Sequence, residues 1–244
     1  MWALVARLLK RDWSPEQISG RLKKEQQVCI SHERIYQYIL KDKWAGGDLY
    51  RQLRCQKERR KRYGRYERRG QLLNCTSIEE LPTLVNRRKR LGDWEVDTLI
   101  GKRHKQAMLS LTERMSRFTL LGKVSHRTAP AVGNQIHRLL LPVSDKVYTL
   151  TSDHGKEFAC HEQVAESLNL KFYFAHPYAA WERGTNENTN GLIRQYFPKK
   201  HDFQEVTQKD IRQVMRWLNF RPRKTLRFKI PFEVFFHVAV ALTT

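Results

Sequence analysis

The chain has 244 residues, of which 40% are hydrophobic, so it has enough length and apolar content for one medium domain and a small one. Its 46 Lys and Arg outnumber 25 Asp and Glu, a formal net charge of +21 that favours a polyanionic partner such as nucleic acid. No segment supplies the roughly 18 consecutive apolar residues of a membrane span. The four cysteines lack the spacing of a zinc site or a C-x-x-C pair, which predicts reduced thiols.

Three short helices are predicted in residues 1–45. Apolar residues at helical spacing mark the first helix, over residues 2–11. Ser14 followed by Pro15 is a typical start for the second, and Ser31 can cap the third. The beginning of the chain is therefore predicted to be a small all-α domain.

The second and third of these helices have the spacing of a helix-turn-helix, with residues 31–40 in the recognition position. This interpretation predicts DNA contacts at Ser31, His32 and Arg34. A plain three-helix bundle fits the periodicity equally well. The basic segment that follows favours the DNA-binding interpretation.

Residues 46–85 are predicted to be a basic linker. Within it, residues 51–70 hold ten Lys or Arg and two Glu. Such a run is typical of a solvated or disordered tract. That interpretation is compatible with binding, because a flexible basic segment can lie along phosphates and become ordered on contact. The DNA-binding residues predicted in this linker are Arg59, Arg60, Lys61 and Arg62.

Residues 86–244 are predicted to form an α/β domain. From Gly92 onwards the pattern follows the order β-β-β-α-β-α-β-α. This order is typical of a ribonuclease H-like fold, in which a mixed five-stranded sheet carries helices on both faces. The predicted strands are 94–100, 106–112, 118–124, 146–152 and 171–174. The predicted helices are 128–141, 156–168, 183–196 and 208–220, followed by a core helix within 230–242.

Three acidic residues from different segments are predicted to converge in this fold. Asp97 lies within an apolar strand, Asp153 ends another, and Glu187 falls in a helix, with 55 and 33 residues between them. The first strand is expected next to the fourth, and the helix of Glu187 is expected across their ends. Oxygen ligands suit two Mg²⁺ or Mn²⁺ ions, which can activate an attacking oxygen and stabilise a leaving one. Spacing alone leaves three alternatives open: Glu95, Glu157 and Glu182.

Several motifs match those of a known family. Two short ones surround the first two acids, GDWEVD at 92–97 and SDHGKEF at 152–158. A long and highly specific one surrounds the third, PYAAWERGTNEN at 177–188, and continues as NGLIRQYFPK at 190–199. With WSPEQI at 13–18 and RPRKTL at 221–226, the match extends over nearly the whole chain. On these motifs the sequence resembles the DDE transposases of bacterial insertion sequences, specifically the insertion-sequence-thirty family.

The resemblance implies a retroviral integrase-like catalytic core in which Asp97, Asp153 and Glu187 are the catalytic, metal-holding acids. It implies a Mg²⁺-dependent transposase that cleaves the phosphodiester at an element's end, so that the freed 3′-hydroxyl attacks target DNA. The implied partners are double-stranded element ends and target DNA, in at least a dimer. The implied location is the bacterial cytoplasm, associated with the nucleoid, with neither a membrane nor a small-molecule substrate involved.

The same resemblance marks four residues around the third acid as DNA-binding: Arg183, Asn186, Asn190 and Arg194. A helix-positioning role is the open alternative for Arg183 and Asn186. Asn190 follows Glu187 by one helical turn and is expected to steady that carboxylate or a metal-bound water.

Some features depart from the family pattern. His154 stands where Asn is expected, and Arg227 and Ile230 stand where Gly and Thr are more usual. Family members typically begin with a further helix-turn-helix region, so we expect this chain to be N-terminally shortened. That expectation leaves open a non-catalytic DNA-binding regulator of transposition. A ribonuclease H-type RNA nuclease would share the acids but does not explain the helix-turn-helix.

Overall fold

A computed structural model describes residues 1–25, 29–53, 72, 74–102, 106–176, 180–199 and 201–240. The chain falls into two compact units: a terminal unit of residues 1–65 with 219–244, and a sheet unit of residues 66–218. The expected division placed 219–244 with the sheet, whereas the observed packing groups this segment with the N-terminal helices.

The terminal unit begins with the three helices that the sequence predicts: α1 (Trp2–Lys10), α2 (Pro15–Glu25) and α3 (His32–Trp44). Ser14 Oγ accepts the N–H of Gln17 at 3.3 Å, and Gln17 Oε1 accepts the N–H of Ser14 at 3.0 Å, so a capping box begins α2 at the predicted start. Ser31 Oγ caps α3 by accepting the N–H of Arg34 at 3.2 Å. The buried apolar core is formed by Val5, Leu8, Leu9, Trp13, Ile18, Leu22, Ile30, Ile35, Ile39 and Leu49.

The C-terminal segment joins this unit through a buried ion pair. Arg21 of α2 donates from Nη1 and Nη2 to the carboxylate of Glu233 at 2.7 and 2.6 Å. Glu233 lies on α9 (Pro231–Phe236). This helix is shorter than the core helix predicted within 230–242, because His237 has a left-handed backbone, φ 55°, that ends it.

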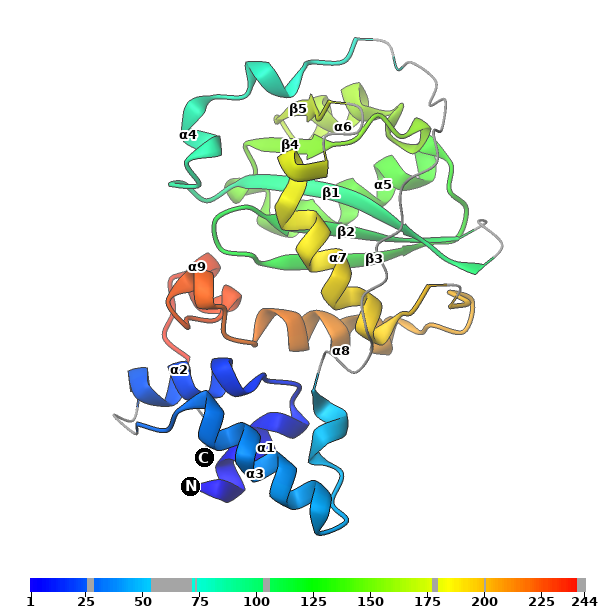
Figure 1. The fold of residues 1–244 in the computed structure, drawn as a ribbon. Helices are drawn as coiled ribbons and strands as arrows, with labels where there is room; N and C mark the ends of the chain where they lie inside the picture. The colour runs from blue at the N-terminus through cyan, green and yellow to red at the C-terminus, as the bar shows by residue number, and fades with distance from the viewer. Residues whose placement is uncertain are drawn as a thin grey trace. The chain divides into compact units, whose positions relative to one another are not determined.

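The sheet unit contains five strands: β1 (Asp93–Ile100), β2 (Ala107–Glu113), β3 (Thr119–Val124), β4 (Thr149–Ser152) and β5 (Lys171–Phe174). Their order is β3-β2-β1-β4-β5 (Figure 1). β1 pairs antiparallel with β2 and parallel with β4, and β4 pairs parallel with β5. The predicted mixed five-stranded sheet of the ribonuclease H-like fold is therefore confirmed, with the first strand beside the fourth.

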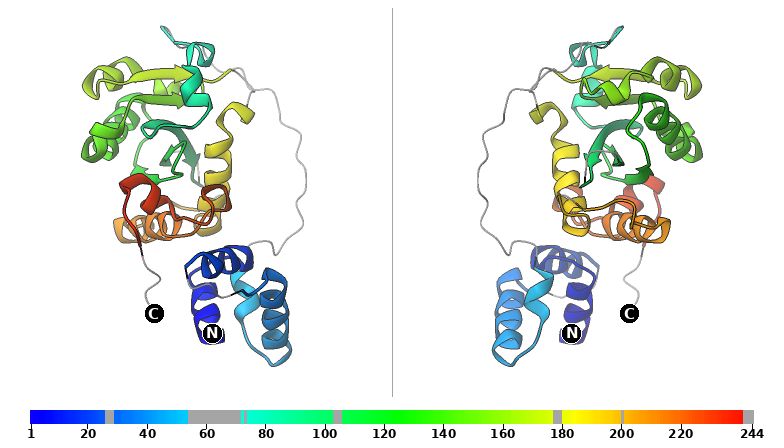
Figure 2. Two further views of the ribbon diagram at one scale, coloured as in Figure 1. Left: turned by 90° about the vertical axis from the view of Figure 1, so that its left-hand side faces the viewer. Right: turned by 90° about the vertical axis from the view of Figure 1, so that its right-hand side faces the viewer.

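Helices cover both faces of this sheet, as predicted. α7 (Gly184–Tyr196) packs on β1 and β2, while α5 (Ala129–Leu140) and α6 (His161–Ser167) lie on the opposite face (Figure 2). α8 (Gln208–Asn219) packs with α7 and the sheet in one apolar core. Their shared core consists of Leu99, Met108, Leu121, Leu192, Ile193, Phe197, Phe203, Val206, Ile211, Val214 and Leu218.

Two element boundaries differ from the prediction. The helix predicted over 156–168 is split into a 3₁₀ turn, η5 (Lys156–Phe158), and the later α6. This turn allows the Glu157 carboxylate to accept the Thr98 hydroxyl of β1 at 2.9 Å, a contact made before the helix begins. β4 begins at Thr149 instead of 146, because residues 141–146 extend α5 as the 3₁₀ segment η4 (Leu141–Lys146).

The remaining elements are short: η1 (Leu49–Gln52), η2 (Ile78–Glu80), α4 (Thr83–Asn86), η6 (Ala180–Arg183) and η7 (Lys224–Leu226). Within the described ranges, every helix is too short or too polar to cross a lipid bilayer.

Candidate active site

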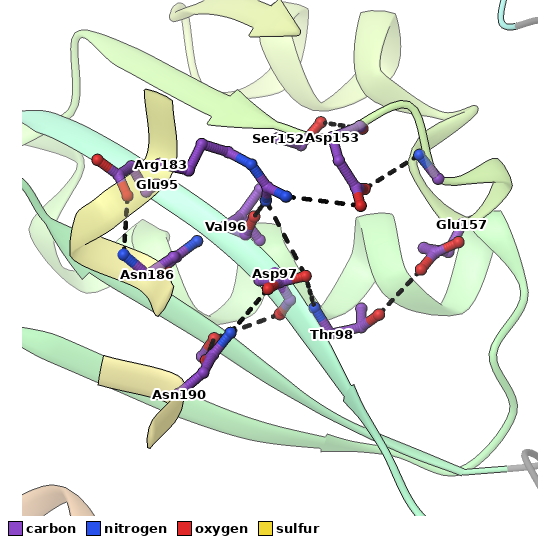
Figure 3. Close-up of polar contacts among 12 residues, drawn as sticks. Glu95, Val96, Asp97, Thr98, Ser152, Asp153, Glu157, Arg183, Asn186 and Asn190 are labelled. Atoms are coloured by element: carbon purple, nitrogen blue, oxygen red, sulfur yellow. Dashed lines mark hydrogen bonds and ion pairs between the residues drawn. The ribbon is translucent and has the colours of Figure 1, made fainter. Parts of the chain in front are cut away.

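Asp97 and Asp153 come together where the pairing between two neighbouring strands, β1 and β4, ends. β1 and β4 are parallel, with Glu95 paired to Thr151, so the residues that follow these positions reach the same edge of the sheet. The guanidinium of Arg183 lies between the two carboxylates (Figure 3). Its Nη1 is 4.0 Å from Asp97 Oδ1, and its Nη2 is 3.5 Å from Asp153 Oδ2.

Asp97 is held in one orientation by two donors. Its Oδ1 accepts the N–H of Thr98 at 2.8 Å, and its Oδ2 accepts Nδ2 of Asn190 at 2.7 Å. Ser110 Oγ donates to Oδ1 of Asn190 at 2.8 Å, so the amide of Asn190 is itself fixed. Burial raises the pKa of Asp97, and the nearby Asp153 carboxylate acts in the same direction, against Arg183 and the two donors. The side chain is still 27% exposed and accessible from solvent.

Asp153 lies in a turn that its own side chain stabilises. Its Oδ1 accepts the N–H of Gly155 at 3.1 Å. A Cβ on Gly155 would lie 3.0 Å from this oxygen and 2.7 Å from Cδ of Glu157, so the turn has no room for a side chain there. His154, the departure from the family pattern beside this acid, packs its ring on Phe174 with centroids 5.2 Å apart.

Glu95 lies on the same face of β1 as Asp97 but has a different environment. It is fully buried, and its Oε2 accepts the N–H of Asn186 in the first turn of α7 at 2.9 Å. Nε of Arg114 lies 3.4 Å from its Oε1. A carboxylate at a helix N-terminus is stabilised by the unpaired N–H groups and the helix dipole. Glu95 therefore anchors α7 on the sheet.

The other two alternative acids also have partners of their own. Glu157 accepts from Thr98 and from Nε of Arg127, the latter at 3.1 Å. Glu182 accepts the N–H and Nδ1 of His176 at 2.9 and 2.8 Å. Asp97 and Asp153 differ from all three alternatives because they share a single cation. These partners support the choice of acids that the family resemblance implies.

Glu187 is exposed on α7 and, among the described residues, forms no hydrogen bond or ion pair. Its position is four residues after Arg183 and three before Asn190, which is one helical turn in each direction on one face. Asn190 contacts Asp97, whereas the sequence led us to expect it beside Glu187. Within the described part of the chain, no three His, Cys, Asp or Glu side chains are positioned to hold a metal ion.

The predicted DNA-binding residues other than Arg183, Asn190 and Arg194 fall into three groups. His32 and Arg34 are exposed on α3, and Ser31 serves as its cap. Asn186 is only 1% exposed, which favours its positioning alternative. The four linker residues Arg59, Arg60, Lys61 and Arg62 lie outside the described residues.

Arg194 is occupied at the other end of α7. It donates to the carbonyl of Ile100 at 3.1 Å and to those of Phe197 and Pro198 at 3.5 and 3.4 Å. Burial lowers its pKa, while the charge of Asp97 acts in the opposite direction. These contacts tie the end of α7 to β1.

Sequence reasoning missed several residues that shape this site. Gly155 had a usable signal, because an Asp two residues before a Gly is typical of a turn closed by the carboxylate. Thr98, Ser110 and Arg127 had none, since their roles depend on residues far along the chain.

Comparison with known proteins identifies clear relatives, although no protein family profile matches the chain. It is 46% identical over 232 residues to the transposase for insertion sequence element IS4351 of Bacteroides fragilis, covering 95% of this chain and 71% of that protein. The transposase for IS1086 of Cupriavidus metallidurans is 38% identical, covering 96% and 71%. Transposase InsI for IS30A of Escherichia coli is 37% identical, covering 98% and 65%.

Solved structures with a similar fold are retroviral integrase cores. The catalytic core of BIV integrase has a TM-score of 0.45 and 18% identity, covering 59% of this chain and 93% of that chain. The HTLV-2 integrase core in complex with magnesium has a TM-score of 0.47 and 16% identity, covering 59% and 96%. At these scores the fold assignment rests on the strand order.

Proposed function

Since the chain belongs to the IS30 family of insertion-sequence transposases, we propose that it performs Mg²⁺-dependent DNA strand cleavage and strand transfer at Asp97, Asp153 and Glu187. Its substrates are the ends of a mobile element and the target DNA. Mn²⁺ can replace Mg²⁺, because both ions prefer oxygen ligands.

The observation that carries this proposal is the cation between Asp97 and Asp153. The Arg183 guanidinium approaches an oxygen of each carboxylate, at 4.0 and 3.5 Å. Both distances are longer than those of a typical charge-assisted hydrogen bond. The two carboxylates therefore face one position that is occupied by a positively charged group. The atoms that could coordinate a metal ion there are all oxygen. This arrangement fits a hard divalent ion, provided that Arg183 moves aside.

Glu187 completes the site from α7. Its exposed side chain lies one turn from Arg183 and one turn from Asn190, and both of those residues reach Asp97. A change of rotamer brings the Glu187 carboxylate toward the same point, since a Glu side chain has three rotatable bonds. Glu95 keeps α7 in register with β1 while this happens.

Two divalent ions held there would activate the attacking oxygen and stabilise the leaving oxygen of the phosphodiester. The protein's own groups provide orientation. Thr98 and Asn190 fix both oxygens of Asp97, and the Gly155 N–H fixes Asp153. Preorganised ligands avoid the cost of reorienting carboxylates during the reaction.

DNA reaches the protein first through charge. The excess of 21 positive charges attracts duplex DNA over long range. In the terminal unit, α3 is the proposed recognition helix, with His32 and Arg34 exposed at its start. Joining two element ends in one reaction requires at least a dimer.

The test is a series of carboxylate-to-amide substitutions in the full chain. Asp97→Asn, Asp153→Asn and Glu187→Gln are each expected to lower nicking and joining of element-end DNA in Mg²⁺ by at least about 100-fold, because each removes a charged ligand. Glu182→Gln is the matched control, since Glu182 is paired with His176 outside the carboxylate pair. Near-normal joining by the first three variants would falsify the proposal.

The same preparation separates this function from its alternatives. A non-catalytic regulator binds end DNA but does not join it in either metal. A ribonuclease H-type nuclease cleaves an RNA–DNA hybrid in preference to duplex DNA. Both outcomes are read from the wild-type protein alone.

A further inference from the structure

The terminal unit contains a groove that the proposed chemistry does not use. Its volume is about 800 Å³, and its walls come from α2 and from the segment 224–229 that follows α8. Four cations line it, Lys23, Lys24, Arg227 and Lys229, and none of the described residues lining it is acidic. We call this feature the basic groove.

All four cations of the basic groove are exposed. Nζ of Lys24 donates to the backbone carbonyl of Arg227 at 3.3 Å, which holds the two walls together. Burial lowers the pKa of Lys24, and the charges of Lys229 and Arg21 act in the same direction. Like charges concentrated in this way favour an anion as the missing partner.

The segment that presents two of these cations has a strained backbone. Arg227 and Phe228 are consecutive residues in the left-handed region, with φ of 53° and 60°. The turn is closed by the N–H of Arg223 donating to Lys229 O at 3.0 Å. Glycine adopts this backbone freely, and Gly is the residue that the family pattern led us to expect at position 227. A cationic residue such as Arg227 at a strained backbone position points to a role in binding.

The groove is preformed, because the strained turn is anchored on α2. A Cβ added to Gly20 would lie 2.4 Å from the ring of Phe228, so only glycine permits this contact. The carbonyl of Phe228 accepts Nη1 of Arg21 at 3.2 Å, although 207 positions separate the two residues along the chain. The two ends of the chain therefore build one surface.

We propose that the basic groove binds the sugar–phosphate backbone of duplex DNA. Its cations match phosphates, and its apolar floor of Leu226, Phe228 and Val234 matches the deoxyribose between them. In a helix-turn-helix the first helix crosses the DNA backbone, and α2 holds that position here. The inference rests on the proposed DNA-binding function and adds a phosphate contact to which the C-terminal segment contributes.

The experiment measures the salt dependence of DNA binding by the full chain, with a fluorescein-labelled mixed-sequence duplex as the probe. The groove variant combines Lys24→Gln, Arg227→Gly and Lys229→Gln. We expect its slope of log K against log [KCl] to be shallower by about 0.9 for each phosphate that the variant no longer neutralises, or roughly 2–3 in all. Affinity falls by roughly tenfold or more at moderate salt.

A matched variant controls for overall charge. Arg7→Gln, Lys10→Gln and Arg11→Gln remove three exposed cations from the beginning of the same unit, outside the groove. This variant is expected to change the slope less than the groove variant. Arg227→Gly alone is expected to raise the melting temperature while weakening binding, because it relieves strain and removes a cation. Opposite changes of this kind exclude misfolding as the cause of weaker binding.

The inference would be overturned if the groove variant kept the wild-type slope, or if both triple variants changed the slope equally. It would also be overturned if inorganic phosphate, at matched ionic strength, displaced the duplex from the wild-type protein but not from the groove variant. The last result would assign the groove to free phosphate. If the wild-type protein does not bind duplex DNA at all, the proposed function itself fails. If the wild-type protein binds duplex DNA and the groove variant binds it with the same slope, the groove inference fails but the proposed function stands.

Discussion

Two clusters of partly buried charge in this molecule use arginine in different ways. In the terminal unit, Arg21 is 2% exposed, makes two short hydrogen bonds to the carboxylate of Glu233 and also forms an ion pair with Glu25 of α2. In the sheet unit, Arg183 faces two carboxylates at longer distances, 4.0 Å from Asp97 and 3.5 Å from Asp153. Each arginine therefore has two carboxylate neighbours, but the first cluster is held by short, directed hydrogen bonds and the second by longer contacts.

The difference separates a structural ion pair from a functional one. Burying a charge is costly, and a bidentate pair recovers most of that cost through directed hydrogen bonds. Asp97 recovers less of this cost, because burial raises its pKa above the ordinary value. Such unfavourable arrangements are typical of sites that await a ligand.

The largest effect on stability is expected from removing Arg21. Arg21→Met removes the cation that pairs with Glu233 and Glu25, and is expected to lower the free energy of unfolding by about 3–5 kcal/mol. Urea denaturation at neutral pH measures this decrease. The control is Lys224→Met, which breaks an exposed pair with Glu16 and should cost less than about 1 kcal/mol. Equal decreases in the two variants would mean that burial does not distinguish the pairs.

A smaller effect of different kind is expected at Arg183. Arg183→Gln removes the cation that competes for the space between Asp97 and Asp153, so Mn²⁺ binding is expected to tighten about tenfold. Isothermal titration of the full chain measures this change, with Arg183→Lys as the charge-retaining comparison. Weaker Mn²⁺ binding by the Gln variant would show that Arg183 supports the site instead of competing for it.

The pH dependence of stability is expected to have opposite signs at Glu233 and Asp97. Burial disfavours the ionised form of Glu233, but the hydrogen bonds from Arg21 and the backbone outweigh it, so its pKa lies below the ordinary 4.5. Its contribution is complete above pH 4.5 and is lost as the pH falls through the folded-state pKa. The raised pKa of Asp97 makes its ionised form destabilising, and this penalty disappears as the pH falls.

Acid titration of stability with Glu233→Gln and Asp97→Asn checks both signs. Each substitution should remove its own contribution from the curve of unfolding free energy against pH. The Glu233 variant is expected to lose stability less steeply than wild type on acidification, and the Asp97 variant more steeply. Parallel curves for all three proteins would rule out this account of the two carboxylates.

The smallest effect on stability is expected from Asp153→Asn. The repulsion of Asp97 by Asp153 is removed, but so is one partner of Arg183, so the free energy of unfolding should change by less than about 1 kcal/mol. Strand joining is nevertheless expected to be abolished. A decrease of several kcal/mol in urea denaturation would instead make Asp153 a structural residue.

Much of the sheet unit could be predicted from local patterns. The strand over 171–174 matches β5 residue for residue, and the order of elements predicts the observed topology. Local patterns failed where a residue's partner is distant. The break between η5 and α6 depends on Glu157 reaching Thr98, and the early end of the C-terminal helix depends on the backbone at His237.

The amino-acid sequence by itself determined the charge of the chain, the position of its helices and strands, and the motifs that identify its family. These properties depend on periodicity and on residue type, which are local. Only the tertiary structure decided which carboxylates are paired and that Asn190 donates a hydrogen bond to Asp97. It also decided that the carbonyl of Arg227 accepts a hydrogen bond from Lys24 of α2, a residue far away along the chain. Those outcomes depend on packing and on distances between remote segments, which no local pattern encodes.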